Sequence, residues 1–352
     1  MGQLKKKIIL TLILSVYAQV VLGAENFLEK QFRSMTQFPR VEILKEITPV
    51  EQLVSLERHL NESKLAGKLW IKRDDLSQKA LGGNKARKLE YLMGDILDKG
   101  ATKISTSGMW GSNHAYSTTV AANQFGVDVE LLLGPQPVSE NVKKKLLADY
   151  ALGADLKYFS NQVTLGLGIA KSWIKSVFNS DYYYIPPGGT NPLSGLGYVN
   201  AFLEMASQFD ASERPERIIL PMGTAGTSAG LLVGRCLAQL ENEVEVIAVG
   251  ISHGALSNKI LLLKTAKKLE KMIRESLSEE ERKDFPNCRF KLNNGSIHYV
   301  SKYSKPGYGA ATKEVHQTIK LMKNIEQITL DQTYSAKAFL YLLDLVKGEL
   351  ES

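Results

Sequence analysis

Residues 217–230 have the sequence RIILPMGTAGTSAG, in which an apolar run passes directly into a glycine-rich turn. The pattern predicts a strand at Arg217–Leu220 and a helix at Ser228–Leu240. A glycine-rich turn at a helix N-terminus can bind phosphate, because free backbone N–H groups and the helix dipole face the anion. The spacing G-x-x-G-x-x-x-G is neither the dinucleotide motif nor the P-loop. We therefore expect Gly223–Gly230 to hold one small phosphate; a packing loop is the alternative.

Short apolar runs alternate with amphipathic stretches through the rest of the chain, a pattern typical of parallel βαβ units. The sequence therefore predicts an α/β fold, with two interleaved α/β layers rather than two separate domains joined by a linker. The predicted strands are 69–73, 103–106, 127–133, 155–159, 182–185, 217–220 and 244–250. The predicted helices are 84–99, one that opens at 112–114, 143–152, 228–240 and a long charged helix at 259–281.

The N-terminus resembles a secretory signal peptide. Lys5, Lys6 and Lys7 precede an apolar run at 8–22, and Gly23 offers a small residue for cleavage before Ala24. We expect removal of residues 1–23, export to the periplasm and no stable membrane insertion afterwards. An uncleaved anchor is the alternative, although the run is shorter than the ~20 apolar residues of a spanning helix.

Composition excludes several classes of protein. The 352 residues are 44% hydrophobic and 23% charged, which is ordinary for a soluble globular chain of one large domain or two packed ones. Signal removal would lower the net charge from +7 to +4. No basic stripe with interleaved aromatics is present, so we expect no nucleic-acid partner. Cys236 and Cys288 form no C-x-x-C pair, and we expect two thiols and no metal site.

A second glycine string precedes a predicted helix. Gly82 and Gly83 permit tight backbone conformations, and Asn84 is placed to cap the helix. Lys85 would lie in the first turn, where the helix dipole disfavours an ammonium and lowers the pKa of the amine. Such a lysine can form a Schiff base. On this string alone, a glycine turn before a solvated basic helix is the simpler interpretation.

Two further strings carry groups suited to catalysis. At 108–114, Ser112 and nearby backbone amides could hold a carboxylate, and Asn113 could reach a phenolic oxygen. His114 alone is more typical of a satisfied structural histidine. Tyr308 lies in Gly307-Tyr308-Gly309 and Tyr334 lies in LDQTYSAKAF, residues 330–339. Each tyrosine by itself is more typical of a core or surface aromatic.

Together and in this order, these strings resemble the fold type II enzymes that use pyridoxal 5'-phosphate. The nearer likeness is to the family of D-cysteine desulfhydrase and 1-aminocyclopropane-1-carboxylate deaminase, from about Phe38 to the C-terminus. The strings that carry it are IKRDDLSQKALGGNKARKLEYL (71–92), GSNHAYSTTVAANQFG (111–126), IPPGGTNPLSGLGYV (185–199), GTAGTSAG (223–230), and GYG followed by LDQTYSAKAF. The resemblance implies a tryptophan synthase β-like fold and a homodimer. Its two parallel-sheet domains would be a discontinuous large one (24–87 and 201–352) and a small one (88–200), with the cofactor between them.

The resemblance also implies roles for individual residues. Lys85 would hold the cofactor and later move protons at the substrate α-carbon. Ser112, Asn113 and His114 would receive the substrate carboxylate, and Asn113 would also bond the cofactor's phenolic oxygen. Tyr308 and Tyr334 would carry protons. The cofactor phosphate would bind at the loop formed by Gly223, Thr224, Ala225, Gly226 and Thr227.

Two departures from the family pattern bear on the substrate. Met109-Trp110-Gly111 stands where members usually carry glycine and then Ile-Gln, so we expect Trp110 to alter the substrate pocket. The deaminases carry Glu after the second tyrosine, whereas this chain has Ser335, and the desulfhydrases carry a hydroxyl residue there. A hydroxyl facing the pyridine nitrogen leaves that nitrogen neutral. Elimination of a thiol demands less of the electron sink than opening a cyclopropane.

We therefore expect a lyase that converts D-cysteine, or a related small β-substituted D-amino acid, to pyruvate, ammonia and a thiol such as hydrogen sulfide. Deamination of 1-aminocyclopropane-1-carboxylate and racemisation are the near alternatives. A cofactor-binding or amino-acid-binding protein without turnover is the alternative of another class. Lys85, Ser112 and the two tyrosines weigh against it, since binding alone needs no proton carriers.

Overall fold

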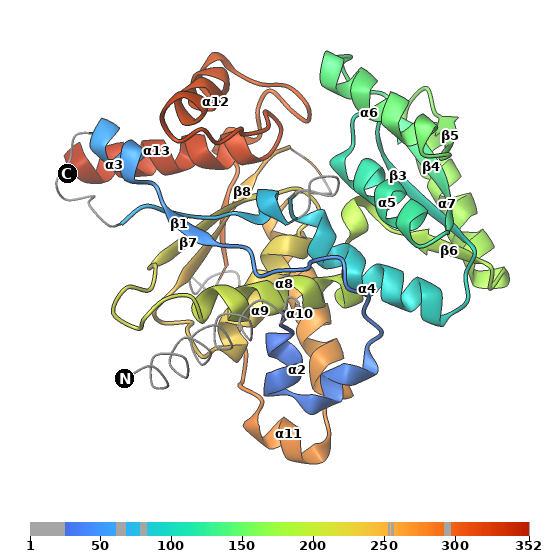
Figure 1. The fold of residues 1–352 in the computed structure, drawn as a ribbon, viewed down its shortest axis with the longest axis horizontal. Helices are drawn as coiled ribbons and strands as arrows, with labels where there is room; N and C mark the ends of the chain where they lie inside the picture. Colours follow the sequence, from blue (N-terminus) through green and yellow to red (C-terminus); the bar gives the residue numbers. More distant parts are fainter. Residues whose placement is uncertain are drawn as a thin grey trace, which may run out of the picture.

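Two parallel sheets form the framework of the computed structural model (Figure 1). The structure describes residues 25–60, 68–77, 83–252, 254, 257–291 and 297–351, so the predicted signal peptide lies outside the described residues. One sheet has the order β5-β4-β3-β6, the other has the order β7-β8-β9, and β1 pairs antiparallel with β2. The strands are β1 Val50–Gln52, β2 Trp70–Lys72, β3 Lys103–Met109, β4 Asp128–Gly134, β5 Asp155–Tyr158, β6 Tyr182–Ile185, β7 Arg217–Met222, β8 Glu245–Gly250 and β9 His298–Val300.

Helices connect the parallel strands, as the alternating pattern predicts. The α-helices are α2 Phe27–Gln31, α3 Val54–His59, α4 Lys85–Asp98, α5 Asn113–Gln124, α6 Glu140–Ala151, α7 Gln162–Phe178, α8 Pro192–Ala206, α9 Gly226–Leu237, α10 Lys259–Ser276, α11 Glu279–Asp284, α12 Lys313–Ile325 and α13 Ser335–Glu351. The 3-10 helices are η1 Arg33–Gln37, η3 Asp74–Leu76, η4 Pro187–Gly189 and η5 Lys302–Ser304. No helix in the described part of the chain is long and apolar enough to cross a membrane.

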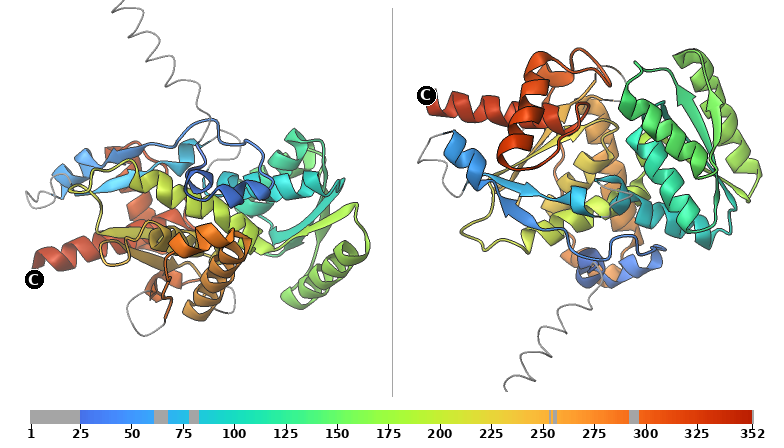
Figure 2. Two further views of the ribbon diagram at one scale, coloured as in Figure 1. Left: turned by 90° about the horizontal axis from the view of Figure 1, so that it is seen from below. Right: turned by 45° about the horizontal axis from the view of Figure 1, so that its top comes forward.

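The four-stranded sheet carries its own helices and lies to one side of the molecule (Figures 1 and 2). Helices α5 and α7 pack against its strands, and α6 packs on α5. Buried apolar side chains from α4, β3, α5 and β4 form a continuous core there. This packing holds the N-terminal end of α5 at the carboxyl end of β3, which is where an α/β sheet places ligands.

A helical layer packs beside the three-stranded sheet. Helix α8 packs closely on α9 and α4, and α10 covers α9. Gly230 allows the close approach of α9 to α8, since a Cβ there would lie 2.4 Å from the Cβ of Tyr198. The boundary that we predict at residue 200 falls within α8, and the division into domains stays a prediction. Helices α12, α13 and α3 share a third apolar cluster.

Two expectations about the long charged helix and the cysteines are wrong. The long helix predicted at 259–281 ends at Ser276, because Leu277 is extended and Ser278 is the N-cap of α11, with a capping box to Glu281. The two cysteines are not thiols, since Cys236 and Cys288 form a disulfide. Helices α10 and α11 lie between them in sequence, and the chain returns to bring the two Cα atoms within 5.6 Å.

Candidate active site

Lys85 begins α4 and is the centre of the site. Its side chain is 9% exposed, and burial lowers the pKa of its amine to about 8 while the nearby Asp331 carboxylate opposes the change. We predicted a lowered pKa from the helix dipole; the cause that the structure shows is burial. A buried amine with this pKa is partly neutral near pH 7.5 and can act as a nucleophile.

Asn84 does not cap α4, contrary to our expectation. Its backbone is already helical, with φ −65° and ψ −5°, and its side chain makes no capping bond. Its Nδ2 instead donates to Thr227 Oγ1 at 2.8 Å. Asn84 therefore joins the start of α4 to the predicted phosphate loop, so that Lys85 and the loop face one site.

A buried ion network anchors the first turn of α4. The Arg87 guanidinium is 2% exposed and donates to the Asp74 carboxylate at 3.0 Å and to Glu204 at 2.8 Å. Tyr198 also donates to Asp74 at 2.6 Å, and Lys72 pairs with Glu204 at 2.5 Å. The network explains why an acid pair precedes the lysine string: the first acid, Asp74, binds the arginine two residues after Lys85.

The predicted phosphate loop has the conformation that an anion cradle needs. Ala225 takes a left-handed conformation, φ 65° and ψ −13°, immediately before α9 begins at Gly226. An alanine at positive φ is strained, and such strain is found mainly at ligand sites. Thr224 Oγ1 lies 2.7 Å from Thr190 Oγ1. Gly188 passes so close that a Cβ there would meet Thr224 Oγ1 at 2.3 Å. Hydroxyls and the first N–H groups of α9 thus gather at the loop.

Lys88 adds a buried amine to this loop, and the sequence analysis missed it. Its side chain is buried, and its Nζ has long contacts to the Gly188 carbonyl at 3.3 Å and to Thr190 Oγ1 at 3.4 Å. A Cβ on Gly226 would lie 2.7 Å from that Nζ. Burial and the neighbouring Lys85 lower the pKa of Lys88 well below its usual value. A bound phosphate would supply the missing counter-charge. The sequence signal that could have identified Lys88 is its spacing of three residues from Lys85, since residues i and i+3 share a helix face.

The N-terminal turn of α5 has the capped helix start that the predicted carboxylate site requires, and its role as an anion site stays a prediction. Ser112 is the N-cap, and its Oγ accepts from the Ala115 N–H at 3.2 Å. Asn113 follows as the first helical residue, and its Oδ1 accepts from Lys145 Nζ of α6. The first N–H groups of a helix lack partners within it and can bind a carboxylate. No residue pattern in the sequence pointed to Lys145.

The side chain of His114 faces the protein interior and has a structural role. Its Nε2 lies 2.8 Å from Thr106 Oγ1 and its Nδ1 lies 3.4 Å from Thr118 Oγ1. Burial lowers its pKa well below the usual value, so the ring is neutral. Only its backbone N–H remains suited to the predicted carboxylate. Trp110, which we expected to alter the pocket, packs against the core of the four-stranded sheet.

Tyr308 and Tyr334, the predicted proton carriers, lie together. Tyr334 donates to the Tyr308 hydroxyl at 3.2 Å, and the rings meet edge to face with centroids 6.0 Å apart. Burial raises the pKa of both hydroxyls, so both are protonated at neutral pH. A Cβ on Gly223 would lie 3.4 Å from the Tyr334 ring, which places that ring beside the phosphate loop. The pair can hold and deliver protons there.

The segment around the second tyrosine is fixed by two further residues that we did not single out. Asp331 Oδ1 accepts the N–H groups of Thr333 and Tyr334 at 2.8 and 2.7 Å. Lys337 is fully buried and donates to the carbonyls of Ile251 and Gly307, each at 3.0 Å.

Ser335 begins α13, and its Oγ accepts the Asp331 N–H at 2.8 Å. The Ser335 hydroxyl can also donate to the Asp331 backbone carbonyl and to its carboxylate, each at a long distance of 3.5 Å.

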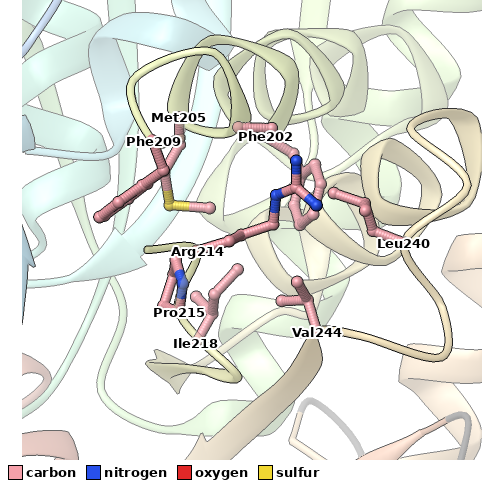
Figure 3. Close-up of a pocket in the computed structure, with 9 residues that line it drawn as sticks. Phe202, Met205, Phe209, Arg214, Pro215, Ile218, Leu240 and Val244 are labelled. Atoms are coloured by element: carbon pink, nitrogen blue, oxygen red, sulfur yellow. The ribbon is translucent and has the colours of Figure 1, made fainter. Parts of the chain in front are cut away.

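Other candidate sites do not compete with this one. Figure 3 shows an apolar hollow between the end of α8 and the start of β7, crossed by Arg214. None of the predicted site residues lines it. Within the described ranges, no cluster of three or more His, Cys, Asp or Glu side chains could hold a metal ion.

Comparisons with known proteins agree with this geometry. The family model described as "Pyridoxal-phosphate dependent enzyme" matches residues 42–352. A putative 1-aminocyclopropane-1-carboxylate deaminase of Pyrococcus horikoshii is 34% identical over 91% of this chain and 91% of its own length. A D-cysteine desulfhydrase of Klebsiella pneumoniae is 32% identical over 89% of this chain and 90% of its own. The crystal structure of an ACC deaminase homologue superposes with a TM-score of 0.70 at 33% identity, covering 91% of each chain.

Proposed function

Because this chain belongs to the family of pyridoxal-phosphate dependent enzymes, we propose that it is a lyase that eliminates hydrogen sulfide from D-cysteine. Related small β-substituted D-amino acids would lose the corresponding thiol. D-cysteine and water give pyruvate, ammonia and hydrogen sulfide. Relatives named for the desulfhydrase and for the deaminase match about equally well, so the choice between the reactions depends on residues of this chain.

The residues of the site fit the cofactor. Lys88, Thr224 and the N-terminus of α9 offer its phosphate a buried amine, a hydroxyl and free amides, and the phosphate charge would keep the amine protonated. Lys85 offers a buried amine with a lowered pKa to its carbonyl carbon. Bound pyridoxal phosphate supplies an electron sink that stabilises negative charge at the substrate α-carbon.

The chain's own groups would hold the substrate and move its protons. The N–H groups at the start of α5 and the Ser112 hydroxyl would bind the substrate carboxylate. The Lys85 amine would take the α-proton. Tyr308 and Tyr334, protonated by virtue of their raised pKa, would donate to the leaving sulfur. Asp331 and Lys337 would keep the two tyrosines in place.

Ser335 is the observation that favours elimination over ring opening. Its Oγ accepts the Asp331 N–H at 2.8 Å and makes long contacts of 3.5 Å to two Asp331 oxygens. As an uncharged hydroxyl, it would offer the pyridine nitrogen a neutral hydrogen bond. A glutamate there would offer a charge-assisted bond and favour a protonated pyridine nitrogen. The serine therefore suits the less demanding reaction, loss of a thiol from the β-carbon.

Two rates measured on one preparation test the proposal. The loaded protein should release pyruvate from D-cysteine faster than 2-oxobutanoate from 1-aminocyclopropane-1-carboxylate. The Ser335→Glu variant should shift the ratio toward ring opening, and Ser335→Ala, the matched control, should not. Faster ring opening by the native protein refutes the desulfhydrase. Background rates with both substrates, alongside turnover of other D-amino acids, would refute D-cysteine as the substrate.

We also propose that the enzyme acts outside the cytoplasm, in the periplasm. The signal-like segment 1–23 and the Cys236–Cys288 disulfide independently support this, since structural disulfides are typical of oxidising compartments. N-terminal sequencing of protein from a periplasmic fraction should begin near Ala24. An intact Met1 in the cytosol would contradict it.

A homodimer is proposed as well. Several large apolar side chains of α7 are exposed, among them Val163, Leu167 and Ile174, and a second copy could bury them. Sedimentation velocity should give a dimer that Leu167→Glu weakens. A monomer at all concentrations would contradict the dimer.

A further inference from the structure

Lys145 joins α6 to the first turn of α5. It lies midway along α6, and its ammonium reaches the segment that carries the predicted substrate site. The Nζ donates to the Gly111 carbonyl at 3.1 Å and to Asn113 Oδ1. These contacts lie on both sides of Ser112, the N-cap of α5. The single ammonium of Lys145 therefore stabilises the turn from Gly111 to Asn113.

The contact with Asn113 decides which end of its amide faces the site. An ammonium has three donors and no acceptor, so only the amide oxygen can face Lys145. The amide nitrogen is then the end left to donate elsewhere. A cofactor phenolic oxygen that carries negative charge needs a hydrogen-bond donor. If the amide were turned the other way, Asn113 Oδ1 would face that oxygen and repel it.

Two carboxylates act electrostatically on this ammonium. Asp149 lies one turn further along α6, and Asp331 approaches from the segment before α13; both raise the pKa of Lys145, whereas burial lowers it by more. The Asp149 side chain is itself buried, at 1% exposure. The hydrogen bonds of the ammonium go to the turn before and at the start of α5, at Gly111 and Asn113.

We propose that Lys145 is a positioning residue, which holds Asn113 Oδ1 so that the amide nitrogen of Asn113 donates to the phenolic oxygen of the cofactor. The inference deepens the proposed function, because it rests on the assignment of Asn113 to that oxygen. Lys145 itself does not touch the cofactor. Its effect on cofactor binding is therefore expected to pass through Asn113.

The experiment titrates apo full-length protein with pyridoxal phosphate and follows the visible absorbance band. Lys145→Met removes the donor at similar volume, and we expect the affinity to fall about tenfold or more, as for loss of a charge-assisted hydrogen bond. Lys145→Gln keeps an N–H donor and should retain most of the affinity. Lys144→Met, on an exposed side chain of the same helix, is the matched control and should bind as the native protein does.

The decisive comparison repeats Lys145→Met in an Asn113→Ala background. If Lys145 acts through Asn113, the second substitution should add little to the first. An equal loss in both backgrounds, or unchanged binding in Lys145→Met, overturns the inference. If Asn113→Ala binds pyridoxal phosphate with full affinity, the premise that Asn113 binds the cofactor is wrong, and the inference is overturned. Thermal melting monitored by circular dichroism shows whether each variant folds. If Lys145→Met does not fold, the comparison uses Lys145→Gln, and a loss of affinity in that variant would overturn the inference.

None of these measurements uses turnover of D-cysteine. Failure of this inference can therefore be distinguished from failure of the proposed reaction.

Discussion

The buried Arg87 should be the most costly side chain to remove near the site. In Arg87→Met, Asp74 and Glu204 lose a guanidinium that contacts both carboxylates. Loss of one partner of a buried ion pair costs about 3–5 kcal/mol. Glu204 keeps Lys72 at 2.5 Å and Asp74 keeps the Tyr198 hydroxyl at 2.6 Å. We therefore expect about 3 kcal/mol, the lower end of that range.

Urea unfolding of the apo protein, followed by circular dichroism, measures this loss. The matched control is Arg73→Met, since Arg73 also pairs with two carboxylates, Glu51 and Asp75, which are 42% and 51% exposed. We expect the control to lose less than about 1 kcal/mol. Arg87→Met should also weaken pyridoxal phosphate binding, because Arg87 anchors the turn that carries Lys85. If both variants lose the same free energy of unfolding, the network does not hold α4 in place.

Three further predictions concern the cofactor and the fold. Lys88→Met should weaken binding of pyridoxal phosphate by about tenfold or more and leave binding of unphosphorylated pyridoxal unchanged, as loss of a phosphate contact requires; equal effects on both ligands in equilibrium dialysis would exclude that role. Capture of pyridoxal phosphate by the apo protein should accelerate with pH through about 8, because the neutral Lys85 amine reacts and its pKa is lowered to that value; a stopped-flow midpoint near that of an ordinary lysine would show an exposed amine. Replacing Cys236 and Cys288 by serine should cost roughly 4 kcal/mol, from loop closure over a sequence separation of 52 residues; an unchanged urea midpoint would show that the pair is not bonded.

Local signals in the sequence predicted most of the framework. Strand β6 was predicted at its observed bounds, and β3, β4 and β7 within a few residues, because apolar runs between glycine or proline turns are unambiguous at this length. Lys85 was correctly placed at the start of a helix. The break between α10 and α11 could have been found, since Ser278 and Glu281 have the spacing of a capping box.

The features that were missed depend on contacts between distant segments. The Cys236–Cys288 disulfide needs the chain to return after two helices. Asn84 has the residue type of a cap, but its side chain binds Thr227, which is 143 positions away in sequence. Lys145 looks like one of three adjacent surface lysines, and only the packing of α6 on α5 directs it into the site. Residue types and spacing carry no signal for such contacts.

Borohydride reduction of the loaded protein, followed by peptide mass spectrometry, tests the central claim most directly. The site holds four buried or half-buried lysines, Lys85, Lys88, Lys145 and Lys337, so the modified residue is informative. The account predicts the pyridoxyl mass on Lys85 alone, because Lys88 faces the phosphate loop and the other two amines are engaged with carbonyl or amide oxygens. The adduct on any other lysine, or no adduct after incubation with pyridoxal phosphate, would contradict it.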